Sequence, residues 1–446
     1  MKRFFTSLLL LAISFSVLGQ NYVDKIDTLM MNHVREGKFN GVVLVAQKGK
    51  VLLEKGYGFK NWEEKSLNDK STVFQVGSVT KQFTAAVVMQ LQQEGKLSVQ
   101  DKISKYFPGF PNGDRITIEH LLTHTSGIFN YTNDTVLMRG DVTKPRPESE
   151  MIALFQNRPL NFEPGSNWEY SNSGYSLLGY IIAKVEKKGY EQVVRERILQ
   201  PLKMVNSGFD FTHLSTPAKA KGYFVLTAAS AVPAPIVDST IAYSAGALYS
   251  TVGDLYKWER SISSGKILSP ESWKKTFTPV RNNYGYGWTI DSVFGRRLIA
   301  HSGGIHGFAS YLLRFPEDDV AIIFLTNSSA RGLGKLGNTI GAILFGKPYE
   351  LAASSVEVKL DTTVMRQYVG DYQLAPGFNI QVTLKDGQLF GQGTGQPPFQ
   401  MFPKSSSRFF LKAVEAEVEF FRDATGSVKE MVLYQGGREL KGAKVQ

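Results

Sequence analysis

The stretch FQVGSVTK, residues 74–81, joins a short extended segment to a long helical pattern. Beyond it, apolar residues recur at the spacing of one helical face until a glycine interrupts the pattern, at Phe83, Val87, Val88, Leu91 and Gly95. We therefore predict an extended segment that turns at Gly77 into a helix over residues 78–95. Ser78 and Lys81 lie three residues apart, which on a helix is one turn and the same face.

This spacing brings together the two groups that a serine nucleophile requires. A serine hydroxyl needs a base, and a lysine in an enclosed site can be neutral and take its proton. We also expect the Ser78 hydroxyl at a helix N-terminus, where backbone N–H groups favour negative charge. The spacing alone is weak, because Ser263–Lys266 and Ser272–Lys275 repeat it. The alternative is that Ser78 caps the helix and Lys81 is solvated.

Two further segments carry groups suited to catalysis. In Tyr170-Ser171-Asn172 we expect the tyrosine to present a phenol for proton transfer and the asparagine an amide for a substrate carbonyl. The short pattern recurs at Tyr131-Thr132-Asn133, so it too is weak in isolation. His301-Ser302-Gly303-Gly304 follows an extended run over residues 298–300, and its glycines would let a substrate backbone approach a strand closely.

Together and in this order, these elements resemble the serine hydrolases with penicillin-recognising folds. The group comprises class C β-lactamases, D-alanyl-D-alanine carboxypeptidases and related penicillin-binding-protein-like esterases. The resemblance covers residues 21–346 and rests on four blocks with family-like order and spacing. The blocks are FQVGSVTK at 74–81, HLLTHTSGI at 120–128, the stretch 164–175, and HSGGIHGF at 301–308.

The resemblance implies a role for each of these residues. Ser78 would be the acylated nucleophile, Lys81 its base partner and Tyr170 the second proton-transfer group. Asn172 would bind a substrate amide, and His301, Ser302 and Gly303 would form the strand triplet beside the substrate. The backbone N–H groups of Ser78 and Gly304 would form the oxyanion hole.

The triplet departs from the family pattern, because class C β-lactamases usually carry Lys-Thr-Gly where this chain has His301-Ser302-Gly303. A histidine with a pKa near 6.5 is mostly neutral at pH 7, so we expect it to attract a substrate carboxylate fully only at lower pH. This favours a peptidase or esterase that acts on D-amino peptides or esters over an efficient β-lactamase. The alternative function is a catalytically silent binder of cell-wall peptides or acyl ligands.

The order of the predicted elements indicates an α+β protein. Extended runs at Gly41–Gly58 and over residues 298–327 flank a helical middle, which predicts one antiparallel sheet built from both ends of the region. Together with the resemblance, this arrangement predicts a β-lactamase/transpeptidase-like domain over residues 20–350. Short alternating runs follow over residues 356–446, which we interpret as a small all-β barrel or sandwich that folds alone. It contains no histidine.

The first nineteen residues have the pattern of a secretory signal peptide. Lys2 and Arg3 precede an apolar stretch from Phe4 to Leu18, and Gly19 offers a small residue for cleavage. The mature chain would then begin at Gln20 and be periplasmic or secreted. An uncleaved membrane anchor is the less favoured alternative, because the stretch is shorter than the ~20 residues of a spanning helix.

Composition narrows the choice of cofactor and partner. The 446 residues include no cysteine, and no Gly-rich nucleotide-binding motif is present. His120 and His124 have the spacing of zinc ligands, but Leu121 stands where the zinc motif needs glutamate, so we predict no metal and no cofactor. The net charge of +11 is spread among acidic residues, which argues against nucleic acid and allows association with the cell envelope. The expected partner is a small-molecule or peptide substrate, and the oligomeric state stays open.

Overall fold

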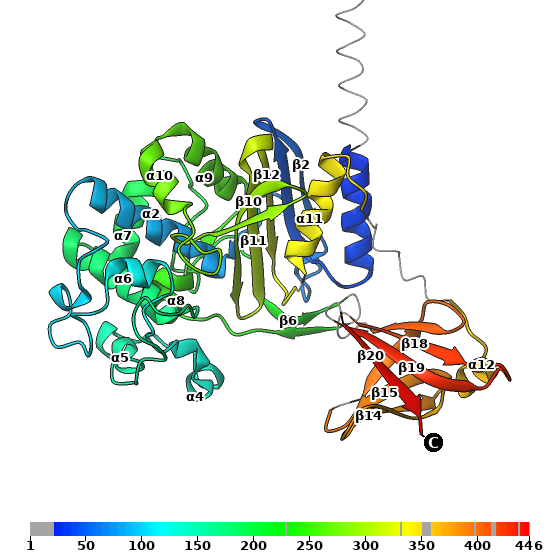
Figure 1. Ribbon diagram of the computed structural model, residues 1–446. Helices are drawn as coiled ribbons and strands as arrows, with labels where there is room; N and C mark the ends of the chain where they lie inside the picture. Colours follow the sequence, from blue (N-terminus) through cyan, green and yellow to red (C-terminus); the bar gives the residue numbers. More distant parts are fainter. Residues whose placement is uncertain are drawn as a thin grey trace, which may run out of the picture. The chain divides into compact units, whose positions relative to one another are not determined.

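A six-stranded antiparallel sheet forms the centre of the first of two compact units, residues 1–349 (Figure 1). Its strand order is β2-β1-β12-β11-β10-β9, so the N-terminal hairpin pairs with the last strand of the unit through β1 and β12, which confirms the predicted α+β sheet. The strands are β1 (Gly41–Gln47), β2 (Lys50–Tyr57), β9 (Thr289–Val293), β10 (Arg296–Ile305), β11 (Phe308–Phe315) and β12 (Val320–Thr326).

The computed structural model describes residues 22–227, 230–330, 332–349, 358–396, 398–411, 416–435 and 438–445. The predicted signal peptide and the junction between the two predicted domains lie outside these residues. None of the helices formed by the described residues has the length and apolar character that a membrane span requires.

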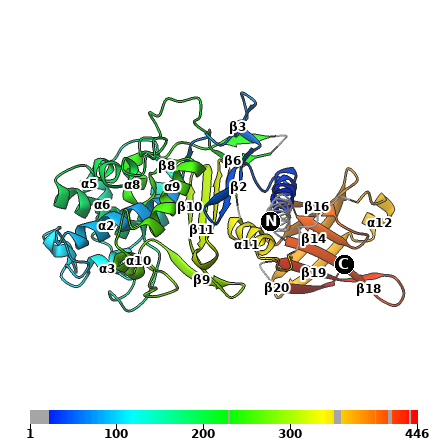
Figure 2. The ribbon, with the colours of Figure 1, turned by 90° about the horizontal axis from the view of Figure 1, so that it is seen from above.

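Both faces of the sheet are buried, which explains why β1 is apolar at nearly every position. Val43 and Val45 pack in a cluster with the helix over residues 22–35 and with α11 (Leu333–Leu344). Val42 and Leu44 point to the other face and pack with the helical region. Figure 2 shows α11 on one side of the sheet and α2, α6, α8 and α9 on the other.

The helical region supplies most of the chain between β2 and β9. Its helices are α2 (Thr80–Gln93), α3 (Ile118–Leu122), α4 (Thr135–Arg139), α5 (Glu148–Ala153), α6 (Asn172–Glu186), α7 (Tyr190–Val194), α8 (Ser239–Gly246), α9 (Val252–Ser264) and α10 (Pro270–Thr276). Short helical turns in the same region are η1 (Gly77–Val79), η2 (Ile103–Lys105), η3 (Tyr131–Asn133) and η4 (Arg195–Leu199), and a fifth, η5 (Pro316–Asp318), joins β11 to β12. Two-stranded pairs are β3 (Phe59–Asn61) with β4 (Ser66–Leu67), β5 (Phe74–Gln75) with β8 (Tyr249–Ser250), and β6 (Tyr223–Leu226) with β7 (Ala231–Pro233).

The helix predicted from residue 78 begins differently in the structure. Gly77 adopts a φ of 53°, in the left-handed region, and opens the 3₁₀ turn η1 that contains Ser78. The Thr80 hydroxyl donates to the Gly77 carbonyl at 2.7 Å, and α2 starts there. Ser78 therefore lies in a tight turn directly before the helix that carries Lys81.

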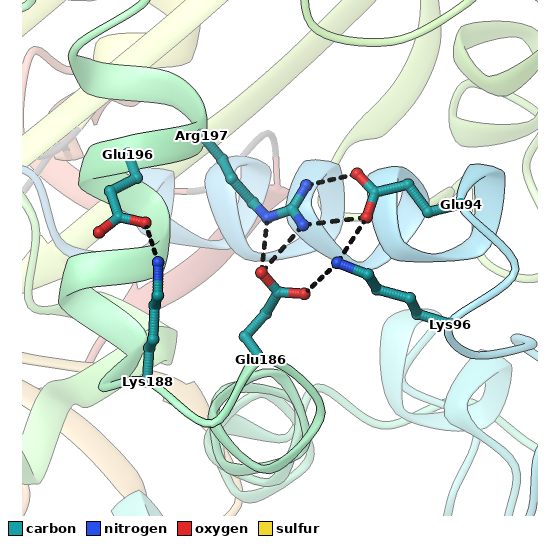
Figure 3. A network of polar contacts seen from close by, with 6 residues as sticks. All are labelled: Glu94, Lys96, Glu186, Lys188, Glu196 and Arg197. Atoms are coloured by element: carbon teal, nitrogen blue, oxygen red, sulfur yellow. Dashed lines mark hydrogen bonds and ion pairs between the residues drawn. The ribbon is translucent and has the colours of Figure 1, made fainter.

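Ion pairs hold the far end of α2 against its neighbours (Figure 3). Arg197 binds Glu94, just past α2, at 2.6 Å and Glu186, at the end of α6, at 2.9 Å. Lys96 also binds both carboxylates, at 2.9 and 2.8 Å. The Arg197 and Glu186 side chains are only 18% and 12% exposed, so this pair is better shielded from solvent than an ordinary surface pair. The network fixes the packing of α2 on α6.

The second unit, residues 350–446, forms a closed eight-stranded barrel in its described part, which confirms the predicted all-β domain. A short helix, α12 (Thr362–Arg366), precedes the strands. The strands are β13 (Gly370–Ala375), β14 (Phe378–Lys385), β15 (Gln388–Gly393), β16 (Phe399–Pro403), β17 (Arg408–Leu411), β18 (Ala416–Arg422), β19 (Val428–Gln435) and β20 (Arg438–Lys444). Alternate residues such as Tyr372, Val382, Val418 and Met431 fill the interior.

Each unit should unfold around its own core. Ile323 in β12 and Met431 in β19 are both fully buried. We expect Ile323→Ala and Met431→Ala each to lower the free energy of unfolding of its own unit by about 2–5 kcal/mol. Differential scanning calorimetry should show two transitions, of which each variant shifts one. A single transition that moves in both variants would contradict independent cores.

Candidate active site

The hydroxyl of Ser78 and the amine of Lys81 face each other across the first turn of α2. Lys81 Nζ lies 3.2 Å from Ser78 Oγ. Lys81 is fully buried, whereas Ser78 is half-buried and lines a pocket of about 360 Å³. The serine hydroxyl is therefore reachable by a ligand and the amine beneath it is not.

The partners of Lys81 define where its lone pair points. Nζ donates to Asn172 Oδ1 and to the backbone carbonyl of Ala245, both at 2.7 Å. Since these two oxygens can only accept, they take two N–H groups of the amine. Burial holds the pKa of Lys81 well below its usual value, which favours the neutral form of the amine. The third direction, toward Ser78 Oγ, is then left for the lone pair.

Two other helices deliver the carbonyl oxygens that hold Lys81. Asn172 begins α6, and its own amide nitrogen donates to Thr132 Oγ1 at 3.1 Å. Ala245 belongs to α8, which kinks at Tyr243 with a φ of 37°. The Tyr243 ring stacks on Tyr180 at 4.7 Å, which supports this uncommon backbone conformation for a residue other than glycine. The kink turns the chain so that the Ala245 carbonyl reaches the amine.

The ring of Tyr170 also lies close to the Lys81 amine. Lys81 Nζ is 4.8 Å from the centre of the Tyr170 ring, and the His124 ring packs on the same tyrosine at 4.3 Å. Burial raises the pKa of the Tyr170 phenol, and its hydrogen bond with the Ser78 side chain partly opposes that rise. The phenol is therefore protonated at neutral pH and available as a proton donor beside Ser78.

Strand β10 runs directly against the turn that carries Ser78. A Cβ at Gly303 would lie 2.0 Å from the Val76 carbonyl oxygen and 3.0 Å from the Ser78 nitrogen, so only glycine fits there. A Cβ at Gly77 would likewise lie 2.7 Å from the Gly304 nitrogen. At Gly303 the close approach is made by the chain's own turn, whereas a Cβ at Gly304 would meet no heavy atom within 4 Å and Gly304 lines the pocket. This approach brings the backbone nitrogens of Ser78 and Gly304 to one place, as an oxyanion hole requires.

The surroundings of His301 favour a neutral ring over the cation expected at low pH. Its Nδ1 lies 2.6 Å from the Ser302 carbonyl oxygen, which can only accept, so Nδ1 carries a proton, and its Nε2 lies 2.8 Å from the Tyr284 hydroxyl. His301 is 4% exposed, and burial is the largest cause that lowers its pKa to about 3, which favours the neutral ring. Ser302 is exposed but does not line the pocket.

The two histidines with zinc-like spacing do not share a helix face. His120 caps α3, where its Nδ1 accepts from the Thr117 N–H, whereas His124 lies beyond the helix and its Nδ1 accepts from the Ser171 N–H. No group of three or more metal-ligating side chains occurs among the residues that the structure describes. His124 instead supports Tyr170 and the loop that leads to Asn172.

The structure thus brings together Ser78, Lys81, Tyr170, Asn172 and Gly304. Sequence reasoning missed Ala245 and Tyr284. Ala245 acts through its backbone carbonyl, and because every residue has one, the sequence does not mark this position. Tyr284 follows two asparagines in a segment without a recognised motif, and only its contact with His301 reveals its role.

Comparison with known proteins agrees with this arrangement. Residues 26–342 match the family model described as Beta-lactamase, and residues 354–444 match a domain of unknown function, DUF3471. The chain is 30% identical to penicillin-binding protein 4* of Bacillus subtilis (strain 168), over 96% of this chain and all of that protein.

Two solved structures extend the comparison. The octameric penicillin-binding protein homologue from Pyrococcus abyssi superposes with a TM-score of 0.69 at 26% identity, over 94% of this chain and 99% of that one. A D-stereospecific amidohydrolase from Streptomyces sp. superposes with a TM-score of 0.59 at 26% identity, over 69% and 94% of the two chains.

The neutral state of His301 can be tested by nuclear magnetic resonance. We expect its ring nitrogens, assigned by comparison with His301→Gln, to keep one set of shifts from about pH 8 to about pH 5, because its pKa is about 3. The unfolded chain binds this proton near pH 6.5, so the contribution of the neutral ring to stability is present above about pH 6.5 and declines as the pH falls toward 3. A titration midpoint above about pH 5 would contradict the observed hydrogen bonds.

Proposed function

The chain belongs to the beta-lactamase family of serine hydrolases, and from this premise we propose that it is an enzyme that forms an acyl-enzyme on Ser78 and releases it to water. The observation that carries the proposal is the set of three contacts around Lys81 Nζ. The Asn172 and Ala245 oxygens occupy two directions around Nζ, at 2.7 Å each, and leave the neutral amine facing the serine hydroxyl. This is the arrangement that a general base needs.

In the acylation step, Lys81 Nζ takes the proton of Ser78 as Oγ attacks the substrate carbonyl. The carbonyl oxygen becomes an oxyanion, which the N–H groups of Ser78 and Gly304 stabilise. The Tyr170 phenol gives its proton to the leaving group as the bond to the carbonyl carbon breaks. The proton held by Lys81 returns to Tyr170 through the active site, and the serine ester remains.

In the deacylation step, a water molecule replaces the leaving group. Its proton passes to the neutral Lys81 amine as its oxygen attacks the ester carbonyl, and Ser78 Oγ takes that proton when its bond to the carbonyl carbon breaks and the acid product leaves. The two groups suit this exchange because their environments shift the pKa values in opposite directions, the amine downward and the phenol upward.

D-amino peptides and esters are the substrates that we propose. The similarity to a D-stereospecific amidohydrolase and to penicillin-binding proteins supports this class. The neutral His301 in place of a lysine argues against substrates that depend on a fixed cation at the triplet, as efficient β-lactam hydrolysis would. We therefore rank peptidase or esterase action above β-lactamase action.

We further propose that the protein is exported to the periplasm or secreted. The proposal rests on Lys2, Arg3 and the apolar stretch that follows them. A net charge of +11 also suits weak association with anionic polymers of the cell envelope.

Covalent labelling tests the nucleophile. We expect a fluorophosphonate probe to modify Ser78, located by mass spectrometry, and Ser78→Ala to abolish the label. Ser263→Ala is the matched control, because Ser263 repeats the spacing to a lysine but lies in α9. This variant keeps Ser78 and should be labelled there as the wild type is. Absence of label in the folded wild type across a broad set of probes would favour the silent binder instead.

The proton-transfer roles predict large losses in catalysis. Lys81→Ala and Tyr170→Phe should each lower kcat/KM by at least about 100-fold, because general acid–base steps contribute about 10²–10⁴-fold. Tyr284→Phe, a buried neighbour that contacts His301, should cost less than about tenfold by the same reasoning. In the wild type, kcat/KM should fall as acid protonates the Lys81 amine. A folded Lys81 or Tyr170 variant that keeps wild-type kcat/KM would disprove that residue's role.

A further inference from the structure

The pocket beside Ser78 is apolar along most of its wall. Away from the serine it is lined by Met138 of α4, Phe224 of β6, Val237, Ile241 of α8 and Ile305 at the end of β10. No lysine, arginine, aspartate or glutamate is found among the described residues that line it. A charged group placed there would lose its water without gaining a counter-ion, which is costly.

The polar groups near the serine are mostly bound within the protein. The Tyr131 hydroxyl donates to the Ile241 carbonyl at 2.7 Å. Asn172 accepts from Lys81 and donates to Thr132 Oγ1, so its amide keeps one N–H for a substrate carbonyl. His306 lies against Phe224 with ring centres 5.5 Å apart, and burial lowers its pKa, so it adds no positive charge at neutral pH.

The position of the pocket assigns it to the acyl half of the substrate. The pocket is lined by Ser78, Asn172 and Gly304 but not by Tyr170. In the proposed mechanism Tyr170 protonates the leaving group, which must therefore lie on the tyrosine side of the carbonyl carbon. The other substituent of that carbon, the acyl group, then extends into the pocket.

We propose that the enzyme selects substrates whose acyl group is an uncharged apolar chain of medium length, held between α8, α4 and the strand β6. This inference rests on the proposed acyl-enzyme at Ser78 and names the substrate class of the same site. The pocket volume of about 360 Å³ accommodates an alkyl chain of several carbons. A carboxylate at the end of that chain would lie among Phe224, Val237 and Ile241, where the described lining residues include no lysine or arginine to balance its charge.

A series of p-nitrophenyl esters tests the selection. The acetate, the butyrate, the hexanoate and the monoester of hexanedioic acid are compared, each corrected for hydrolysis by Ser78→Ala. We expect kcat/KM to rise about threefold for each methylene buried, from acetate to hexanoate. The monoester of hexanedioic acid, which has the same chain length but a terminal carboxylate, should be at least about 100-fold poorer than the hexanoate. Equal kcat/KM for these two esters would overturn the proposal.

Two neighbouring residues of β6 provide a matched pair of variants. Phe224 is 43% exposed and lines the pocket, whereas Val225 is 47% exposed and does not. Phe224→Arg should reduce the preference for the hexanoate over the carboxylated ester by about tenfold or more, because it supplies the missing counter-ion. Val225→Arg should leave the preference unchanged. The same response in both variants would overturn the proposed place of the acyl chain.

A binding measurement separates this inference from the proposed function. In the Ser78→Ala variant, hexanamide should raise the melting temperature and 6-amino-6-oxohexanoic acid should not. If the wild type hydrolyses the acetate through Ser78 but neither rate nor binding distinguishes the charged chain, the inference fails and the proposed function stands. If no ester reacts at Ser78 and the variant still binds hexanamide selectively, the proposed function fails and the selectivity of the pocket stands.

Discussion

The buried amine of Lys81 is the constraint on which the active site depends. An amine without solvent is tolerated because it is neutral and because two carbonyl oxygens accept its hydrogens. Those oxygens come from the start of α6 and from the kinked α8. Both helices must therefore pack on α2 in a way that brings their oxygens within hydrogen-bond distance of Lys81 Nζ. The ion pairs at the far end of α2 hold α6 against α2 and so support the Asn172 side of this alignment.

Much of this architecture could be predicted from the sequence. The continuous apolar run of β1 predicted a strand buried on both faces, and Ser78, Lys81, Tyr170 and Asn172 were expected together. The sequence could not predict that the Ala245 carbonyl completes the site, because any residue supplies a carbonyl and only the kink in α8 aims this one. In the barrel, the residues of β20, RELKGAK, show little of the alternation that marks a strand, so only the structure defines the strand that closes the barrel.

His301 shows why a motif alone does not define electrostatics. Its position on β10 was expected, but its charge depends on Tyr284 and on the Ser302 carbonyl, which together hold a neutral ring. The pocket beside Ser78 also has no lysine, arginine, aspartate or glutamate among its described lining residues. Binding in this pocket therefore relies on shape and on removal of apolar surface from water rather than on fixed charge.

Closure of the barrel has a consequence for how this unit combines with other proteins. Because β13 pairs with β20, Tyr372 near the beginning of the unit lies opposite Lys444 near its end. A folded unit whose two ends lie side by side can be joined to a host at either end, or inserted into a host's surface loop, without stretching the host's backbone. Among the described strands of the barrel, the same closure leaves none as an edge strand to which another chain could add a strand. The barrel thus has the geometry of a transferable module.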